Sequence, residues 1–228
     1  MYFYEYKNRP SLIIKEIRDI NSLEFKQSLN LYQSSFPPNE TRSIEKVITM
    51  LKDDENYHLF IAKDNSSVIG ISLLYIFKPL KVALLDYMAV STRYQRKGIG
   101  KALFEFTIKK CSCYVSGIIG LLIEVQKENG ANLKENNRRK RRIKFYTQLG
   151  VKVLNGVNYL LPSQNEDNLE EMYLMMRPLG KIDSLSKVFV FRYISAIYST
   201  IYKYENNDLL AKLFGTMPTI VHLRDLEG

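Results

Sequence analysis

The spacing of hydrophobic and polar positions predicts a chain in which helices and strands are interleaved. Apolar residues recur at helical spacing over Asn21–Phe36, over Ser43–Asp53 and in the stretch that begins at Ile99. A fourth helix is predicted over Arg138–Gly150, because glycine commonly follows the last residue of a helix. Shorter apolar runs predict strands over Ser11–Ile17, Tyr57–Lys63, Ser67–Phe77, Val82–Val90, Ile118–Gln126, Val151–Leu154, Asn158–Leu161 and Met172–Leu179.

This order predicts a mixed α+β fold with one central sheet. The Val82–Val90 strand is apolar on both faces except at Asp86, so we expect it near the centre of that sheet. We expect residues 1–180 to form the main domain and residues 181–228 to form a C-terminal extension.

The extension is rich in large apolar side chains. It predicts a helix over Ser184–Glu205, a short helix over Asn207–Phe214, and a tail over Gly215–Leu223. Its apolar surface must pack on the main domain or on a partner, because it would otherwise be exposed to water.

The composition limits the location and the partners. The 228-residue chain holds no apolar run near the ~20 residues that span a bilayer, and its N-terminus lacks the order of a secretory signal. We therefore expect a cytoplasmic protein with no membrane span. A net charge of +9 favours anionic partners. Because Cys111, Cys113, His58 and His222 are the only cysteines and histidines, a metal site is not expected.

One loop concentrates the features of an anion site. The segment Gln95–Lys101, "QRKGIGK", lies between the Val82–Val90 strand and a predicted helix. Unpaired backbone N–H groups and the helix dipole attract anions to a helix N-terminus, and glycines allow close approach. Taken alone, the segment is equally consistent with a turn whose basic residues are only solvated. It lacks the spacing of a Walker loop and the third glycine of a dinucleotide fingerprint.

The residues around this loop favour an anion site over a simple turn. The stretch Leu85–Phe106 closely resembles motif A of the GNAT superfamily, the Gcn5-related N-acetyltransferases, in which Gln/Arg-x-x-Gly-x-Gly/Ala follows a hydrophobic strand. Downstream, "RRIKFYTQLGVKVL" resembles a second motif of the family, with its aromatic pair at Phe145 and Tyr146 and its glycine at Gly150. The two motifs occur in the right order, and the resemblance covers roughly residues 11–178.

The resemblance implies that acetyl-coenzyme A or a longer acyl-coenzyme A is the co-substrate. The glycine loop would wrap the pyrophosphate of coenzyme A, and the end of the preceding strand would bind the pantetheine arm and the thioester carbonyl. The implied cofactor-binding residues are Met88, Ala89, Val90, Gln95, Arg96, Lys97, Gly98, Ile99, Gly100 and Lys101. The family's usual asparagine before the second-motif helix has no clean match, which leaves open how the pantetheine arm is held from that side.

Acyl transfer to an amine requires a base, a donor to the oxyanion and an acid for the leaving thiolate. A backbone N–H late in the Val82–Val90 strand is the candidate oxyanion donor. The resemblance implies that Tyr146 is the acid; the alternative is a ring that only packs between helix and sheet. Glu124 is a candidate base at the end of an apolar strand, or a solvated strand end. Glu40 could pair with the incoming amine, or be a loop carboxylate, and Asp86 is a third carboxylate.

The dense basic run Arg138–Arg142 has two interpretations. It is either a solvated helix start, or a contact for the 3′-phosphate of coenzyme A or for an acidic acceptor. Nucleic-acid binding is not expected, because no nucleic-acid-binding motif accompanies the run.

The leading hypothesis is an N-acyltransferase that joins the acyl group of acyl-coenzyme A to a primary amine of a small molecule or a peptide. Leu185–Tyr204 could pack on the main domain, form a homodimer interface, or line a tunnel for a long acyl chain. More loosely, the chain resembles GNAT-type maturases that attach fatty acyl groups to lysine or ornithine side chains of ribosomal peptides. A non-catalytic module that binds coenzyme A is the remaining alternative.

Overall fold

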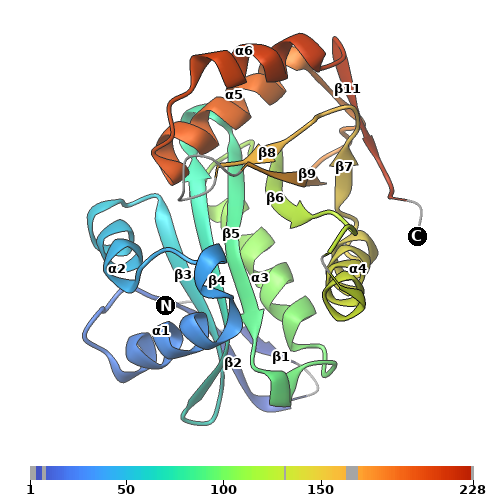
Figure 1. Cartoon of the computed structure of the whole chain (residues 1–228). Coiled ribbons are helices and arrows are strands. Elements are labelled where there is room, and N and C mark those ends of the chain that lie inside the picture. Colours follow the sequence, from blue (N-terminus) through green and yellow to red (C-terminus); the bar gives the residue numbers. More distant parts are fainter. Residues whose placement is uncertain (1–3, 7–8, 131, 163–168, 227–228) are drawn as a thin grey trace. The chain divides into compact units, whose positions relative to one another are not determined.

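The structure, a computed structural model, describes residues 4–6, 9–130, 132–162 and 169–226. The chain divides into two compact units. The first unit comprises Met1–Lys78 and Ala83–Gly117, and the second comprises Pro79–Val82 and Ile118–Gly228. Helices and strands are mixed in both units, which confirms the predicted α+β class (Figure 1). The predicted division at residue 180 stays a prediction.

The first unit is built on a sheet in the order β1-β2-β3-β4-β5, with β1 to β4 paired antiparallel. Its elements are β1 (Tyr4–Tyr6), β2 (Arg9–Ile17), α1 (Leu23–Ser35), α2 (Ile44–Asp53), β3 (Tyr57–Asp64), β4 (Ser67–Phe77), β5 (Val82–Val90) and α3 (Ile99–Tyr114). Serine hydroxyls set the first residues of two helices, because Ser22 accepts from the backbone N–H of Phe25 and Ser43 from that of Lys46.

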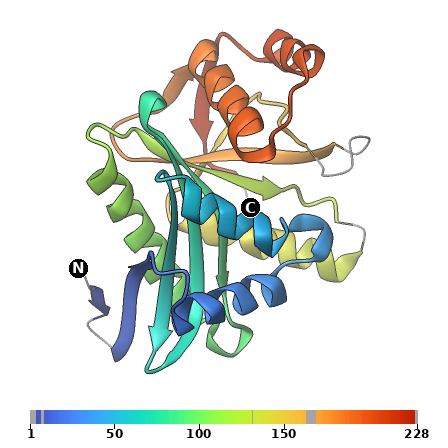
Figure 2. The ribbon, with the colours of Figure 1, turned by 90° about the vertical axis from the view of Figure 1, so that its left-hand side faces the viewer.

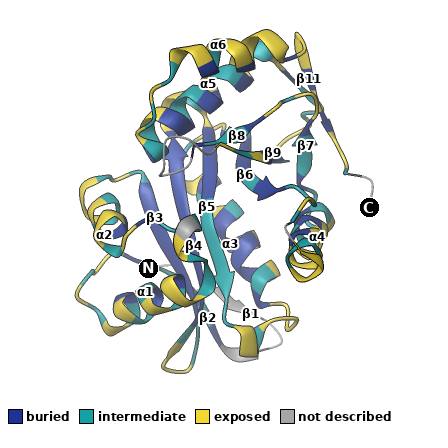
Figure 3. Cartoon of the chain, viewed as in Figure 1, coloured by how far each residue is buried: buried dark blue, intermediate teal, exposed yellow. Residues whose placement is uncertain are grey.

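Helices cover both faces of this sheet (Figure 2). Side chains alternate between the two faces along a strand. Leu59 of β3 and Ile71 of β4 line an apolar cavity together with side chains of α1 and α2. On the other face, the Phe60 ring meets that of Phe106 in α3 at 5.5 Å between centroids, and Ser72 hydrogen-bonds Thr107 of α3. Both faces of β3 and β4 are therefore buried, as Figure 3 shows.

The second unit contains antiparallel strands in the order β6-β9-β7-β11-β10, and β8 pairs with β9. Its elements are β6 (Gly120–Gln126), α4 (Leu133–Gln148), β7 (Lys152–Leu154), β8 (Leu160–Leu161), β9 (Glu170–Pro178), β10 (Ser184–Ser186), α5 (Lys187–Ile197), a π-helical turn (Tyr198–Tyr202), α6 (Asn207–Thr216) and β11 (Ile220–Arg224). The most buried side chains of the extension belong to this unit's core and include Val190, Ile194 and Ile197.

The end of the chain differs from the sequence-based prediction. The predicted tail contains strand β11, which pairs with both β7 and β10. Val221 and Leu223 are buried, whereas Ile220 and Arg224 are exposed, so burial alternates with a period of two along the strand. The helix predicted from Ser184 instead begins at Lys187, after β10, and its last turn is π-helical.

Helix α4 begins earlier than the basic run suggested. Asn132 is its N-cap and accepts a hydrogen bond of 3.0 Å from the backbone N–H of Glu135. Because Arg138 lies within the second turn rather than at the start, the run faces several directions. Arg138, Lys140 and Arg141 are exposed.

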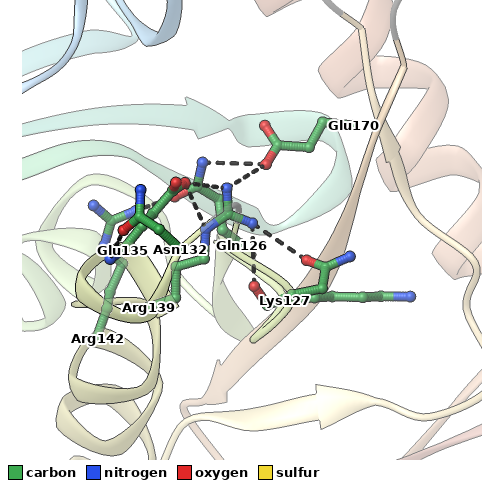
Figure 4. A network of polar contacts seen from close by, with 8 residues as sticks. Gln126, Lys127, Asn132, Glu135, Arg139, Arg142 and Glu170 are labelled. Atoms are coloured by element: carbon green, nitrogen blue, oxygen red, sulfur yellow. Dashed lines mark hydrogen bonds and ion pairs between the residues drawn. The ribbon is translucent and has the colours of Figure 1, made fainter. Parts of the chain in front are cut away.

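Arg139 is the exception in the run, since it is only 8% exposed. Its guanidinium donates to Glu135 at 2.6 Å and to the backbone carbonyl of Lys127 at 3.2 Å, and it forms an ion pair with Glu170 at 3.3 Å (Figure 4). A solvated helix start is therefore the wrong description of Arg139, which ties α4 to strand β9 and to the segment after β6.

Candidate active site

The glycine loop forms the N-terminus of α3 in the first unit. After β5, a short 3₁₀ turn (Thr92–Tyr94) leads to Gln95, whose side-chain amide donates to the backbone carbonyl of Val90 at 3.1 Å. Gly98 is the N-cap of α3 and has φ +80°, in the left-handed region that favours glycine. The first intrahelical bond runs from the N–H of Ala102 to the carbonyl of Gly98, so the preceding N–H groups of the first turn remain directed into the loop.

Positive charge surrounds these N–H groups. Arg96, Lys97 and Lys101 are exposed, and the Lys97 ammonium lies 5.2 Å from the centroid of the Tyr94 ring. Arg96 also has a positive φ of 60°, which turns the backbone sharply just before the helix. An exposed helix N-terminus with basic neighbours and a glycine cap is suited to a phosphate or pyrophosphate group.

The predicted cofactor-binding residues of β5 lie directly before this loop. Met88, Ala89 and Val90 are only half-buried, whereas the first residues of the strand are buried. The carbonyl of Ala89 lies 3.4 Å from the position that a Cβ at Gly70 of β4 would take. Met88–Val90 and Gln95–Lys101 both belong to the first unit. They are consecutive parts of β5, the loop and α3.

Asp86, the polar residue of β5, is held in a buried ion pair. Its carboxylate accepts from the Arg42 guanidinium at 2.5 Å and from the Tyr57 hydroxyl at 2.5 Å, and the side chains of Arg42 and Asp86 are 4% and 1% exposed. Burial and the negative charge of Asp86 raise the pKa of Tyr57 well above its usual range, so its hydroxyl remains a donor. These contacts favour a structural role for Asp86.

The same ion pair organises the segment between α1 and α2. Arg42 lies over the Tyr87 ring at 5.3 Å, and the Tyr87 hydroxyl donates to the backbone carbonyl of Glu40 at 3.0 Å. The backbone N–H of Arg42 donates to the Tyr32 hydroxyl at 2.9 Å. Glu40 is thereby placed at the end of a short 3₁₀ helix, Pro38–Glu40, against the half-buried part of β5.

Glu124 of β6 lies in the second unit, where it is half-buried and hydrogen-bonded. The Tyr159 hydroxyl donates to its Oε1, and the Tyr202 hydroxyl donates to its Oε2 at 2.7 Å. Tyr159 is fully buried, and Tyr202 belongs to the π-helical turn after α5. The C-terminal extension therefore contacts the candidate base directly.

Tyr146 also lies in the second unit, on the buried face of α4 with Arg139 and Ile143. Its side chain is 7% exposed, and its ring contacts that of Phe145 with centroids 5.2 Å apart. Burial raises the pKa of Tyr146 to about 12, and nearby Arg142 opposes this shift. The phenol is consequently protonated at neutral pH, as an acid must be.

Sequence reasoning missed the partners of these carboxylates. Arg42 and Tyr57 hold Asp86, and Tyr159 and Tyr202 hold Glu124. A carboxylate among apolar neighbours needs hydrogen-bond donors, so the sequence around Asp86 and Glu124 signalled that partners must exist without showing which residues they are.

Among the residues that the structure describes, no three histidine, cysteine or acidic side chains are grouped to hold a metal ion. In the same part of the chain, no helix is long and apolar enough to cross a membrane. Both cysteines are free, and burial raises the pKa of the Cys111 thiol to about 12.

Solved structures share this fold across most of the chain. A protein of Bacteroides thetaiotaomicron described as a GNAT-family acetyltransferase is 21% identical, with 84% of this chain and 99% of that chain covered and a TM-score of 0.66. The ribosomal-protein-S18-alanine N-acetyltransferase of Escherichia coli is 22% identical over 75% and 96% of the two chains, with a TM-score of 0.53. Naa50 of Arabidopsis thaliana, in complex with the bisubstrate analogue CoA-Ac-MVNAL, is 19% identical over 73% and 97%, also with a TM-score of 0.53.

A comparison with curated protein sequences finds no match. The model of the acetyltransferase (GNAT) family matches residues 25–150, more than half of the chain, and this stretch contains the glycine loop and the Phe145–Tyr146 pair. The chain therefore belongs to the GNAT acetyltransferase family and is an acyltransferase.

Proposed function

We propose that the protein transfers an acyl group from acyl-coenzyme A to a primary amine. The observation that carries this proposal is the loop Gln95–Lys101, where Gly98 caps α3 in a left-handed conformation and basic side chains surround the first-turn N–H groups. Two relatives support it by their names, since one is an alanine N-acetyltransferase and the other binds an analogue that joins coenzyme A to a peptide. Acetyl-coenzyme A is the first acyl donor to test.

In the proposed reaction the amine nitrogen attacks the thioester carbonyl carbon. A carbon–nitrogen bond forms and the carbon–sulfur bond breaks. The proton lost by the amine goes to Glu124 as base, and the departing thiolate receives a proton from Tyr146. Backbone N–H groups of Met88 or Val90 would stabilise the oxyanion of the tetrahedral intermediate. Glu40 would pair with the incoming amine before it is deprotonated.

The test is an amine-dependent release of coenzyme A thiol. Acetyl-, hexanoyl- and palmitoyl-coenzyme A would each be offered with lysine, spermidine or a short peptide that has a free N-terminal alanine. We expect release that depends on both substrates. Preference for the palmitoyl donor would favour the fatty-acyl alternative and the acyl tunnel. Tight binding of coenzyme A with no transfer from any donor would favour the non-catalytic module.

Replacing Tyr146 with phenylalanine should lower kcat with little change in the KM for acetyl-coenzyme A. The ring would still fill its buried place on α4, but no hydroxyl would protonate the thiolate, and loss of one proton donor typically costs about 100-fold or more. Steady-state kinetics would measure the effect. Tyr193→Phe, which removes a hydroxyl from a buried ring of α5, is the matched control and should keep the wild-type kcat. An unchanged kcat in Tyr146→Phe would remove the acid role.

The basic run, the cellular location and the oligomeric state stay predictions. Arg138, Lys140 and Arg141 are exposed on α4, a position that suits contact with the 3′-phosphate of coenzyme A or with an acidic acceptor. A cytoplasmic location is expected from the sequence alone, and a homodimer interface is one of the three roles that the sequence leaves open for Leu185–Tyr204.

A further inference from the structure

A side chain from the C-terminal extension contributes to the surroundings of Glu124. The hydroxyl of Tyr202 donates to Oε2 at 2.7 Å, while the hydroxyl of Tyr159 donates to Oε1. Each carboxylate oxygen thus accepts one tyrosine hydrogen bond, and Tyr202 is separated from Glu124 by 78 residues of sequence. Tyr159 and Tyr202 both lie outside the stretch matched by the family model, which ends at residue 150.

The backbone around Tyr202 is fixed by packing and by hydrogen bonds. Tyr202 ends a π-helical turn whose residues Tyr198 and Ile201 are fully buried. The Tyr198 hydroxyl donates to the carbonyl of Leu160, the residue after Tyr159, and the rings of Tyr159 and Tyr198 lie 5.8 Å apart. Because the Tyr198 bond ties the turn to the strand next to Tyr159, the two hydroxyls that hold Glu124 are supported together.

The chemistry of this arrangement suits a base. Hydrogen bonds donated to a carboxylate stabilise its ionised form, which is the form that can accept a proton. They also fix the direction of both carboxylate oxygens. Burial and the charge of Glu124 raise the pKa of Tyr159 well above its usual range, so that hydroxyl stays a donor at neutral pH. Tyr198 faces the same charge, and its pKa is also raised.

We propose that Tyr159 and Tyr202 are positioning residues for Glu124, so that the C-terminal extension is part of the catalytic apparatus of this acyltransferase. This inference rests on the proposed function, in which Glu124 is the base. It assigns to the extension a role in the chemical step itself, separate from any role in acyl-chain selection or dimer formation.

The test compares Tyr202→Phe, Glu124→Gln and the double variant with the wild-type protein. Acetyl-coenzyme A and the best amine of the panel above are the substrates, and the pH–rate profile is measured for each protein. Tyr202→Phe should lower kcat about 10-fold, as loss of one hydrogen bond to a charged group would do, and leave the KM for acetyl-coenzyme A unchanged. It should also move the acid limb of the profile to higher pH, because the ionised carboxylate loses a donor.

Non-additivity separates this role from a purely structural one. Glu124→Gln should lower kcat about 100-fold, and adding Tyr202→Phe should lower it no further, because the hydroxyl acts through the carboxylate. Tyr204→Phe is the matched control, since its half-buried hydroxyl contacts Asn206 two residues away. It should retain wild-type kcat and the wild-type pH profile. Equal losses from Tyr202→Phe in the wild-type and Glu124→Gln backgrounds would overturn the proposal.

A measurement that needs no turnover distinguishes failure of the positioning role from failure of the proposed acyl transfer. NMR of protein labelled with carbon-13 at the glutamate carboxyl carbons would follow the titration of Glu124, whose signal is the one missing in Glu124→Gln. The midpoint should rise in Tyr202→Phe. An unchanged midpoint would overturn the positioning role even if the wild-type protein is active. A raised midpoint in a protein that transfers acyl groups to no amine would instead overturn the proposed function and, with it, the base.

Discussion

Replacing Gly98 with aspartate should weaken the binding of acetyl-coenzyme A by at least about 100-fold and leave the fold intact. Asparagine and aspartate tolerate the left-handed backbone that φ +80° requires better than other residues with a side chain do, so we expect the helix start to be kept. The carboxylate of aspartate would place a negative charge in the loop and would repel the pyrophosphate. Isothermal titration calorimetry would measure the affinity, and thermal unfolding would verify the fold.

Gly98→Asn is the matched control for that experiment. Asparagine has nearly the same shape as aspartate and no charge, so the difference between the two variants reports the anionic character of the ligand at the loop. We expect Gly98→Asn to bind acetyl-coenzyme A clearly more tightly than Gly98→Asp does. Equal affinities for the two variants would mean that the loop does not hold a phosphate group.

Replacing Arg42 with methionine should lower the free energy of unfolding by about 3 kcal/mol or more. The substitution leaves the carboxylate of Asp86 buried, with the Tyr57 hydroxyl as its donor and without the guanidinium that lies 2.5 Å away. Removing one member of a buried ion pair leaves an uncompensated charge in a low-dielectric environment. Urea unfolding, followed by circular dichroism, would measure the change.

The double variant Arg42→Met/Asp86→Leu tests the cause of that loss. With both charges removed, much of the lost stability should return, since apolar groups of similar size often replace a buried ion pair at little cost. The exposed pair Lys78–Glu55, joined at 2.6 Å, provides a surface control, and Lys78→Met should change stability by less than about 1 kcal/mol. A double variant as unstable as Arg42→Met would show that the guanidinium acts through packing rather than through charge.

The elements with strong periodicity were predictable from the sequence. The helices over α1, α2 and α3 and the strands from β2 to β6 lie where the apolar spacing placed them, because each buries one face or both faces against its own unit. The glycine loop was also predictable as a strand-to-helix junction, since glycine is among the residues favoured at a helix N-cap and an apolar run precedes it.

The parts that depend on distant residues were not predictable. Strand β11 is only a short alternation in isolation and becomes a strand by pairing with β7, which lies far from it in the sequence. Arg139 belongs to a run of five basic residues, and its burial and its contacts, among them those with Glu135 and Glu170, distinguish it only in the folded chain. The link between Tyr202 and Glu124 likewise has no local signal, because tyrosine is an ordinary residue on the apolar face of a helix.

The most direct test of the central claim is mass spectrometry of an amine incubated with the protein and acetyl-coenzyme A that carries a carbon-13 label in its acetyl group. The account predicts an amide that contains the label, formed in a one-to-one ratio with free coenzyme A thiol. Gly98→Asp should form no amide at a donor concentration that supports the wild-type protein. Free thiol and labelled acetate without amide, across every amine in the panel, would contradict an N-acyltransferase.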